Sequence, residues 1–424
     1  MVLKRKQEST QAVDFAFTQK SQRLQSEMEA FFRDCILPNN AAWIAHVAHS
    51  ETAPPFLEEL KARARAQGLW NLALPDLPDG FPGTRLTNLE FAPLAEIMGR
   101  LPWAPIVFNC HAPNVPNIEI LLRYGTPEQK REWLMPLLDG RGMSAFAMTE
   151  PAVASSDARN IATRIRREGN DYVIDGRKWY ISGAGHPECR LLIVMGVTDL
   201  GGASGARHSI VLVPTTTHGV RIVRRLPIFG HGEASGAPVE LAFEGVRVPS
   251  GNILGEEGIG FAIGQARLGP ARVHHCMRSL GQCEVLIQLM TERAQSRKAF
   301  GRTIAEYANV QDAIALSRIE VEQARLLVCK TAWMLDQGGA SAARSAISMI
   351  KVAVARTFSQ VADRAVQIFG AMGVSDDSPV AQAYTAARAM RIYDGPDEVH
   401  LRAIFNLERP GLVGESAQYL SLGG

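Results

Sequence analysis

Hydrophobic residues recur at helical spacing in the first third of the chain. Amphipathic stretches cover Phe15–Phe32, Phe56–Gln67 and Leu89–Met98, and a glycine follows each of the last two. The segment Thr126–Gln129 has the residues of a capping box with proline at the first helical position, so another helix should begin there. The pattern predicts an N-terminal helical domain over residues 1–144.

The pattern changes to alternation near residue 145. Turn-forming pairs at Gly169-Asn170 and Asp175-Gly176 separate short alternating runs, and Val239, Leu241 and Phe243 alternate most clearly. The expected strands cover residues 161–167, 172–174, 178–181, 191–197, 209–214, 220–224 and 239–243. We therefore expect a compact middle β domain over residues 145–254, built as a small barrel or sandwich.

Helical spacing returns after residue 255. In a helix expected from Tyr307 to Gln337, apolar residues recur every seven positions, and a second helix should follow from Ser341 to Gly370. Such a stripe usually packs in a core and sometimes forms a subunit interface. The glycines between 255 and 264 lack the spacing of a dinucleotide-binding turn and predict a loop. Residues 255–424 are expected to form a C-terminal helical bundle domain.

Composition narrows the function classes. The 424 residues are 46% hydrophobic and carry a net charge of +2 without a long run of one sign, which argues against nucleic-acid binding. The six cysteines form no CxxC pair and the histidines no HExxH spacing, so neither a disulfide framework nor a metal site is expected. Without a signal peptide or an apolar run long enough to span a membrane, the sequence predicts a cytoplasmic protein.

The densest candidate chemistry lies near the C-terminus. Three carboxylates fall within five residues: Asp394, Asp397 and Glu398. Asp394 directly precedes Gly395 and Pro396, where a helix cannot continue. A carboxylate on such a turn can point into a cavity, and burial there would raise its pKa towards that of a useful base. Alternatively, Asp394 caps the next helix. The local sequence leaves both interpretations open.

Six segments together resemble the acyl-CoA dehydrogenase family. They are Ala147–Asp157, Gly176–Ser182, Val246–Pro249, Arg297–Gly301, Gln367–Gly373 and Ile392–Gly395. They follow the family's order across residues 60 to 410, and two of them are most similar to the branch of animal members ten and eleven. The resemblance implies an α+β fold with an N-terminal helical domain, a middle β-barrel or sandwich and a C-terminal four-helix bundle.

The resemblance also implies a reaction. Family members use FAD to oxidise the Cα–Cβ bond of an acyl-CoA to the 2-enoyl-CoA, as in fatty-acid β-oxidation, with the hydride passing to flavin N5. They pass electrons to an electron-transfer flavoprotein and form homodimers or homotetramers. The family's base is a glutamate at the position of Asp394. A subset carries it instead before a CoA-contacting arginine that matches Arg272, where this chain has Ala271.

The other site residues are likewise carried over from the family. The resemblance implies FAD contacts from Met148, Thr149, Ser155, Tyr180, Ser182, Arg297, Phe300, Gln367, Gly370, Gly373 and Glu398, with Arg297 meeting the FAD pyrophosphate from the adjacent subunit. It implies substrate contacts from Ser156 and Arg272.

Two alternatives stay open within the same fold. The shorter aspartate base is also compatible with a nitroalkane-oxidase-like flavin oxidase or a monooxygenase. A DNA-binding flavoprotein relative would need a basic last domain. After residue 380 the chain has four arginines against five acidic residues, so its charge does not favour DNA binding.

Overall fold

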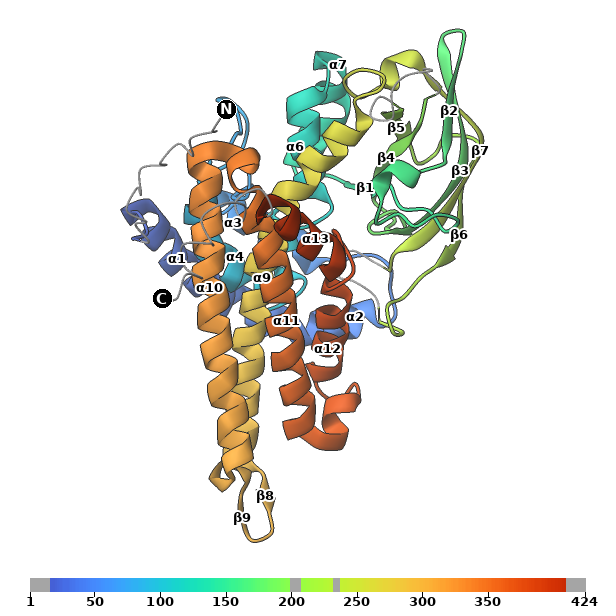
Figure 1. Cartoon of the computed structure of the whole chain (residues 1–424). Helices are drawn as coiled ribbons and strands as arrows, with labels where there is room; N and C mark the ends of the chain where they lie inside the picture. The colour runs from blue at the N-terminus through green and yellow to red at the C-terminus, as the bar shows by residue number, and fades with distance from the viewer. Residues whose placement is uncertain (1–15, 199–206, 232–236, 409–424) are drawn as a thin grey trace, which may run out of the picture.

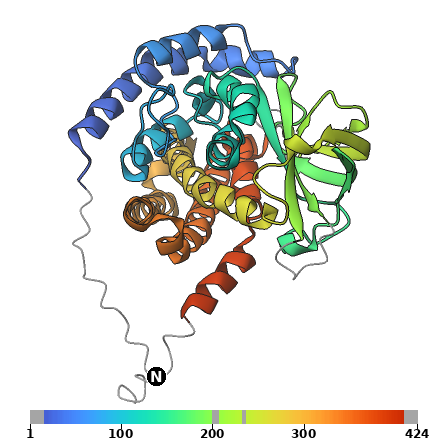
Figure 2. The same ribbon diagram turned by 90° about the horizontal axis from the view of Figure 1, so that it is seen from above.

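The computed structural model describes residues 16–198, 207–231 and 237–408. It has three parts: helices from the first third of the chain, one curled sheet at the side, and a long helical bundle (Figure 1). Seen from above, the N-terminal helices and the bundle lie together, and the sheet stands on their flank (Figure 2). The expected α+β fold of two helical parts around a middle β part is confirmed. Among the described residues, no helix is long and apolar enough to cross a membrane.

The N-terminal part contains helices at the four predicted places and several that the sequence did not indicate. The elements are α1 Gln19–Phe31, η1 Phe32–Ile36, η2 Leu37–Asn39, α2 Asn40–Val47, α3 Phe56–Ala66, α4 Asn88–Gly99, α5 Ala104–Val107, α6 Asn114–Tyr124, α7 Pro127–Gln129, η3 Lys130–Leu134 and α8 Met135–Leu138. The first predicted helix began at Phe15, which lies outside the described residues. The capping box is confirmed, because the Thr126 side chain accepts from the Gln129 backbone N–H and Gln129 accepts in return.

The middle part is a single seven-stranded sheet. Its strands are β1 Met143–Ala147, β2 Arg164–Glu168, β3 Asp171–Ile181, β4 Cys189–Val197, β5 His208–Pro214, β6 Val220–Arg225 and β7 Val239–Pro249. They lie in the order β1-β4-β2-β3-β7-β6, and β5 pairs with β4. The short 3₁₀ turns η4 Ala158–Asn160 and η5 Ser250–Asn252 flank the strands.

One predicted turn in this sheet is wrong. The pair Asp175-Gly176 does not separate two strands, because β3 runs through it and pairs with β7 on both sides. The register shifts between Ile174 and Gly176, which marks a β-bulge. A Cβ atom on Gly176 would lie 2.5 Å from the Thr163 Oγ1, so glycine is required for close backbone approach and not for a turn.

The C-terminal part is the predicted bundle. Its elements are α9 Gly260–Ser296, β8 Lys298–Ala299, β9 Arg302–Thr303, η6 Ile304–Glu306, α10 Ala308–Ala342, α11 Arg344–Phe369, η7 Gly370–Val374, α12 Val380–Met390 and α13 Asp397–Glu408. The heptad residues Val321, Val328 and Leu335 are buried in the core. The glycine run was only partly a loop, since α9 already begins at Gly260.

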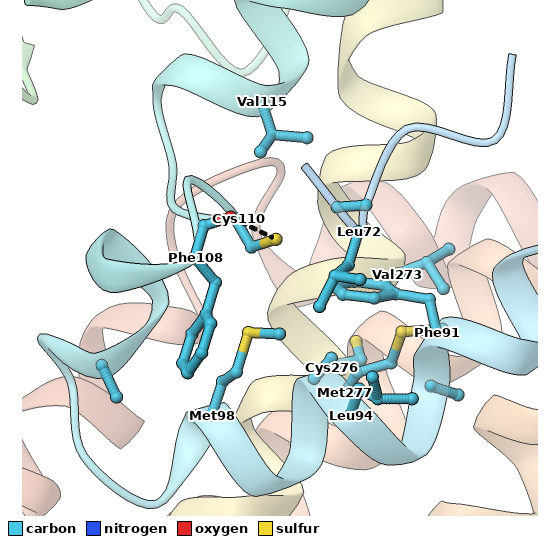
Figure 3. Packing of buried hydrophobic residues seen from close by; sticks show 14 of the residues in the cluster. Leu72, Phe91, Leu94, Met98, Phe108, Cys110, Val115, Val273, Cys276 and Met277 are labelled. Carbon is cyan, nitrogen blue, oxygen red and sulfur yellow. Dashed lines mark hydrogen bonds between the residues drawn. The ribbon is translucent and has the colours of Figure 1, made fainter. Parts of the chain in front are cut away.

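The helices α4 and α9 cross at unusually close range. A Cβ atom on Gly99 would lie 2.0 Å from the carbonyl oxygen of Arg278, and one on Gly281 would lie 1.9 Å from that of Glu96. Beside this crossing, apolar and sulfur-containing side chains of both helices pack against one another (Figure 3). The two glycines therefore fix the position of α9 relative to the N-terminal part.

Gly281→Ala should destabilise the protein by about 1–3 kcal/mol or more, because the new methyl group would meet backbone atoms that cannot move aside cheaply. Urea unfolding followed by far-UV circular dichroism would measure the loss. Gly251→Ala is the matched control, since a Cβ atom there meets nothing within 4 Å. Equal unfolding midpoints for the two variants would contradict the close crossing.

Candidate active site

A cavity of about 2110 Å³ lies where the three parts meet. Its walls come from α2, the segment before α6, the ends of β1 and β3, the middle of α9, and α12 with the turn after it. It exceeds the roughly 300–1,000 Å³ usual for one small ligand, so a cofactor and a substrate can share it. Sites at such junctions are the common arrangement in multi-part enzymes.

Asp394 lies on the turn between α12 and α13 and lines this cavity. Its backbone is left-handed, with φ +53°, and the side chain is 17% exposed. Arg272 Nε donates to the Asp394 carbonyl oxygen at 2.7 Å, and His400 Nε2 lies 3.2 Å from the same oxygen. Because α13 begins at Asp397, Asp394 is not its N-cap residue. The contacts of Arg272 and His400 thus fix the main chain of Asp394, which places its carboxylate at the cavity wall.

The other two acidic residues of the cluster have different places. Asp397 is buried and accepts from Arg391 Nη2 at 2.8 Å, with Arg356 Nε at 3.5 Å. Glu398 is exposed and does not line the cavity. The structure therefore separates one carboxylate that faces the cavity from one that anchors α13 and one that faces outwards.

Two cavity residues near Asp394 were missed by sequence reasoning. His275 Nε2 lies 3.5 Å from Asp394 Oδ2, and burial lowers the pKa of His275 to about 3. Arg267 is buried, donates from Nε to Asn117 Oδ1 at 2.8 Å, and lies 4.4 Å over the Phe146 ring. Burial lowers the pKa of Arg267 to about 10, so it stays charged at neutral pH. The adjacent His274-His275 pair was the only signal in the sequence for either residue.

The sheet contributes the opposite wall. All six predicted site residues from this part line the cavity: Met148, Thr149, Ser155, Ser156, Tyr180 and Ser182. Thr149 and the neighbouring Trp179 exchange two hydrogen bonds, which tie the segment after β1 to β3. Tyr180 has a left-handed backbone, with φ +52°, and its side chain is 49% exposed. A left-handed backbone is energetically costly for a tyrosine, and the ring remains outside the core. An exposed aromatic ring held in this way suits a ligand contact.

A buried ion pair supports this wall from behind. Lys178 Nζ lies 2.8 Å from Glu150 Oε1 and donates to the Met148 carbonyl oxygen at 2.8 Å. Glu150 also accepts from the backbone N–H groups of Ala162 and Thr163, at 2.8 and 2.9 Å. Burial lowers the pKa of Lys178 to about 8. The nearby Glu150 carboxylate acts in the opposite direction, because it favours the charged ammonium group of Lys178. The pair thus fixes the segment after β1 against β3.

The predicted FAD contacts from the C-terminal part do not line the cavity. Arg297 and Phe300 lie at the β8–β9 hairpin, at the tip of the bundle opposite the sheet (Figure 1). Phe300 is 98% exposed, and Arg297 is also exposed. Gln367 lies at the end of α11, and Gly370 and Gly373 lie in η7, which follows it. One chain does not bring these residues to the Met148–Ser182 wall.

Comparison with known proteins defines the class. Family models for the N-terminal, middle and C-terminal domains of acyl-CoA dehydrogenase match residues 18–141, 145–246 and 258–406. The chain therefore belongs to the acyl-CoA dehydrogenase family and is an oxidoreductase of that family, as the motifs indicated.

Individual relatives agree with this assignment. FadE2 of Mycobacterium tuberculosis, named as a probable acyl-CoA dehydrogenase, is 51% identical over 401 residues, covering 93% of this chain and 97% of FadE2. Acyl-CoA dehydrogenase family member 11 of Homo sapiens is 43% identical over 402 residues, which cover 93% of this chain but 51% of that protein. The chain thus spans about half of that relative. A solved acyl-CoA dehydrogenase family protein of Mycobacterium abscessus has a TM-score of 0.90 and 44% identity, covering 93% of this chain and 99% of that one.

A more distant solved structure shares the fold. PigA, solved as a complex with FAD, has a TM-score of 0.80 and 22% identity, covering 95% of this chain and 100% of PigA.

Proposed function

We propose that this protein is an FAD-dependent acyl-CoA dehydrogenase that forms a 2-enoyl-CoA, with Asp394 as the base that removes the α-proton. The observation that carries the proposal is the position of Asp394, on the wall of a junction cavity and facing it with a partly exposed carboxylate. A carboxylate is a suitable base for a proton acidified by a neighbouring thioester. Ala271, at the alternative position, lines the same cavity and cannot take a proton.

The cavity wall from the sheet suits a flavin ring. Met148, Thr149, Tyr180 and Ser182 would hold it, because they combine an exposed aromatic face, hydroxyl groups and main-chain groups on a rigid support. Ser155 lies on the same wall, where its hydroxyl accepts from the Glu150 N–H at 2.9 Å. Bound FAD would supply the acceptor for the hydride that leaves the β-carbon of the substrate. The protein's part is to exclude water from the junction and to present the Asp394 carboxylate to the α-proton.

Substrate contacts would come from Ser156 and Arg272. Both line the cavity, and Arg272 already uses its Nε to hold the Asp394 carbonyl oxygen. Its terminal guanidinium nitrogens would meet the CoA portion while Nε fixes the base, which couples substrate binding to the position of Asp394.

The FAD site would be completed by a second subunit. Arg297 and Phe300 would reach the FAD of the neighbouring chain, and Gln367, Gly370, Gly373 and Glu398 would complete the site from outside the cavity. The exposure of Arg297 and Phe300 supports a homodimer or a homotetramer, because an exposed cation and an exposed aromatic ring on one hairpin are available to a second chain. We also propose that the chain divides into three domains, with boundaries at residues 144/145 and 254/255.

Arg297→Glu should weaken FAD binding by at least ~10-fold, because a forked cation that can bind a diphosphate becomes an anion. Titration of apoprotein with FAD, followed by flavin fluorescence, gives the dissociation constant. Arg63→Glu, a charge reversal at an exposed position of α3, is the control and should bind FAD like the wild type. If both variants bind FAD equally well, Arg297 has no part in the cofactor site.

The reaction itself is tested by screening acyl-CoA thioesters for anaerobic bleaching of the bound flavin. Bleaching by at least one thioester, with slow reoxidation in an oxygen pulse, is the expected result. Rapid reoxidation would favour the alternative, a nitroalkane-oxidase-like flavin oxidase or a monooxygenase. An aspartate base at position 394 is compatible with that alternative. We propose electron-transfer flavoprotein as the natural acceptor, and cytoplasmic fatty-acid β-oxidation as the setting.

A further inference from the structure

A chain of polar contacts runs from α9 to the Asp394 carboxylate. Arg278 Nη1 donates to the carbonyl oxygen of Cys110 at 3.1 Å, and Arg278 Nη2 lies 3.3 Å from His275 Nδ1. On the other side of the imidazole, His275 Nε2 lies 3.5 Å from Asp394 Oδ2. His275 and Arg278 are one helical turn apart, so both can face the same turn of the cavity wall.

The contact with Arg278 fixes which ring nitrogen of His275 carries the proton. A guanidinium group only donates hydrogen bonds, so His275 Nδ1 must accept. In a neutral imidazole the proton then resides on Nε2, the ring nitrogen that lies 3.5 Å from Asp394 Oδ2. The neutral form is favoured because burial lowers the pKa of His275 to about 3, and because Arg267, Arg278 and Lys351 oppose a positive ring more than Asp394 favours one.

The Asp394 side chain needs such a partner. Its main chain is held by Arg272 and His400 at the carbonyl oxygen, so what remains free is rotation about the two side-chain bonds. In the part of the chain that the structure describes, His275 brings a polar side chain to 3.5 Å from the carboxylate. The Tyr393 ring lies 5.1 Å from the His275 ring and limits how far the imidazole can turn.

We propose that His275 is a positioning residue that holds the Asp394 carboxylate towards the substrate by donating from Nε2, with Arg278 selecting its tautomer. This inference rests on the proposed function of Asp394 as the base. It deepens that function, because a carboxylate with a short side chain reaches the α-proton only over a narrow range of rotation. A misplacement of about 1 Å can cost on the order of a hundredfold in rate.

The test compares His275→Gln with His275→Met, two side chains of similar length. Glutamine can still donate a hydrogen bond from a nitrogen near the place of Nε2, whereas methionine cannot. The expected result is a kcat about 10–100-fold below wild type for His275→Met at nearly unchanged KM, with most of kcat restored in His275→Gln. Equal losses in the two variants would overturn the inference. His274→Gln is the control, because His274 is buried against Phe91 in the core.

A second measurement does not depend on activity. In protein labelled with ¹⁵N-histidine, long-range ¹H–¹⁵N spectra report the protonated ring nitrogen, and the signal of His275 is assigned by its loss in either His275→Gln or His275→Met. A neutral ring protonated on Nε2 is expected, while an Nδ1-protonated or doubly protonated ring would overturn the inference even if a variant fails to fold. If no acyl-CoA bleaches the wild-type flavin, the proposed function fails, and the spectra still decide the tautomer.

Discussion

Asp394→Asn should retain bound FAD and lose bleaching by acyl-CoA, with the rate of flavin reduction falling by roughly 10²–10⁴-fold. Asparagine keeps the size of the side chain and cannot accept the α-proton, and general-base catalysis accounts for effects of this size. Stopped-flow absorbance of the flavin under anaerobic conditions measures the rate, and the visible spectrum shows that the cofactor is present.

The matched control is Asp312→Asn, the same change at an exposed position of α10. Flavin reduction in this variant should match the wild type. Undiminished bleaching in Asp394→Asn would refute the base assignment and would return the search to the other carboxylates of the cavity wall, Glu51, Asp157 and Glu188.

The length of the base can be tested separately. Asp394→Glu restores the residue that the family carries at this position, but it moves the carboxylate by about one bond length within a turn that Arg272 and His400 hold. We expect a partial loss of rate, on the order of a hundredfold. A rate equal to or above the wild type would show that the turn does not compensate for the short side chain.

Sequence patterns predicted correctly those features whose interacting residues lie close together in the chain. Thr126 and Gln129 form their capping box within four residues, so the local sequence already contains both partners. Gly176 shows the limit, because a glycine after aspartate is typical of turns and of bulges alike. The choice depends on pairing with β7, which lies more than sixty residues further along the chain.

The candidate site likewise contains residues that the sequence could predict and residues that it could not. Asp394 could be proposed because it lies in Ile392–Gly395, one of the six segments that resemble the family, whereas the local sequence alone left a helix cap open. His275 could not, since His274 and His275 are equivalent in the sequence and only the packing of α9 turns one to Phe91 and the other to Asp394. Arg297 remains a prediction, because its proposed partner belongs to another subunit.

The second large effect is expected at the ion pair behind the cavity wall. Lys178 has no exposed side-chain surface and Glu150 has 5%, so Lys178→Met would leave the Glu150 carboxylate buried without its counter-charge. Breaking such a pair typically costs about 3–5 kcal/mol. The change would also remove the donor to the Met148 carbonyl oxygen, so FAD binding should weaken along with stability. Urea unfolding and FAD titration measure the two losses.

The matched comparison separates burial from charge. Arg166→Met removes an exposed partner of Asp175 on the same sheet and should cost at most about 1 kcal/mol. The double variant Lys178→Met with Glu150→Gln should recover part of the stability, because it no longer buries an unpaired charge, although the backbone N–H groups of Ala162 and Thr163 would lose a charged acceptor. FAD binding should stay weak in the double variant, because the Met148 carbonyl oxygen still lacks its donor. Recovery of FAD binding together with stability would show that the pair supports the fold alone and does not hold the cofactor wall in place.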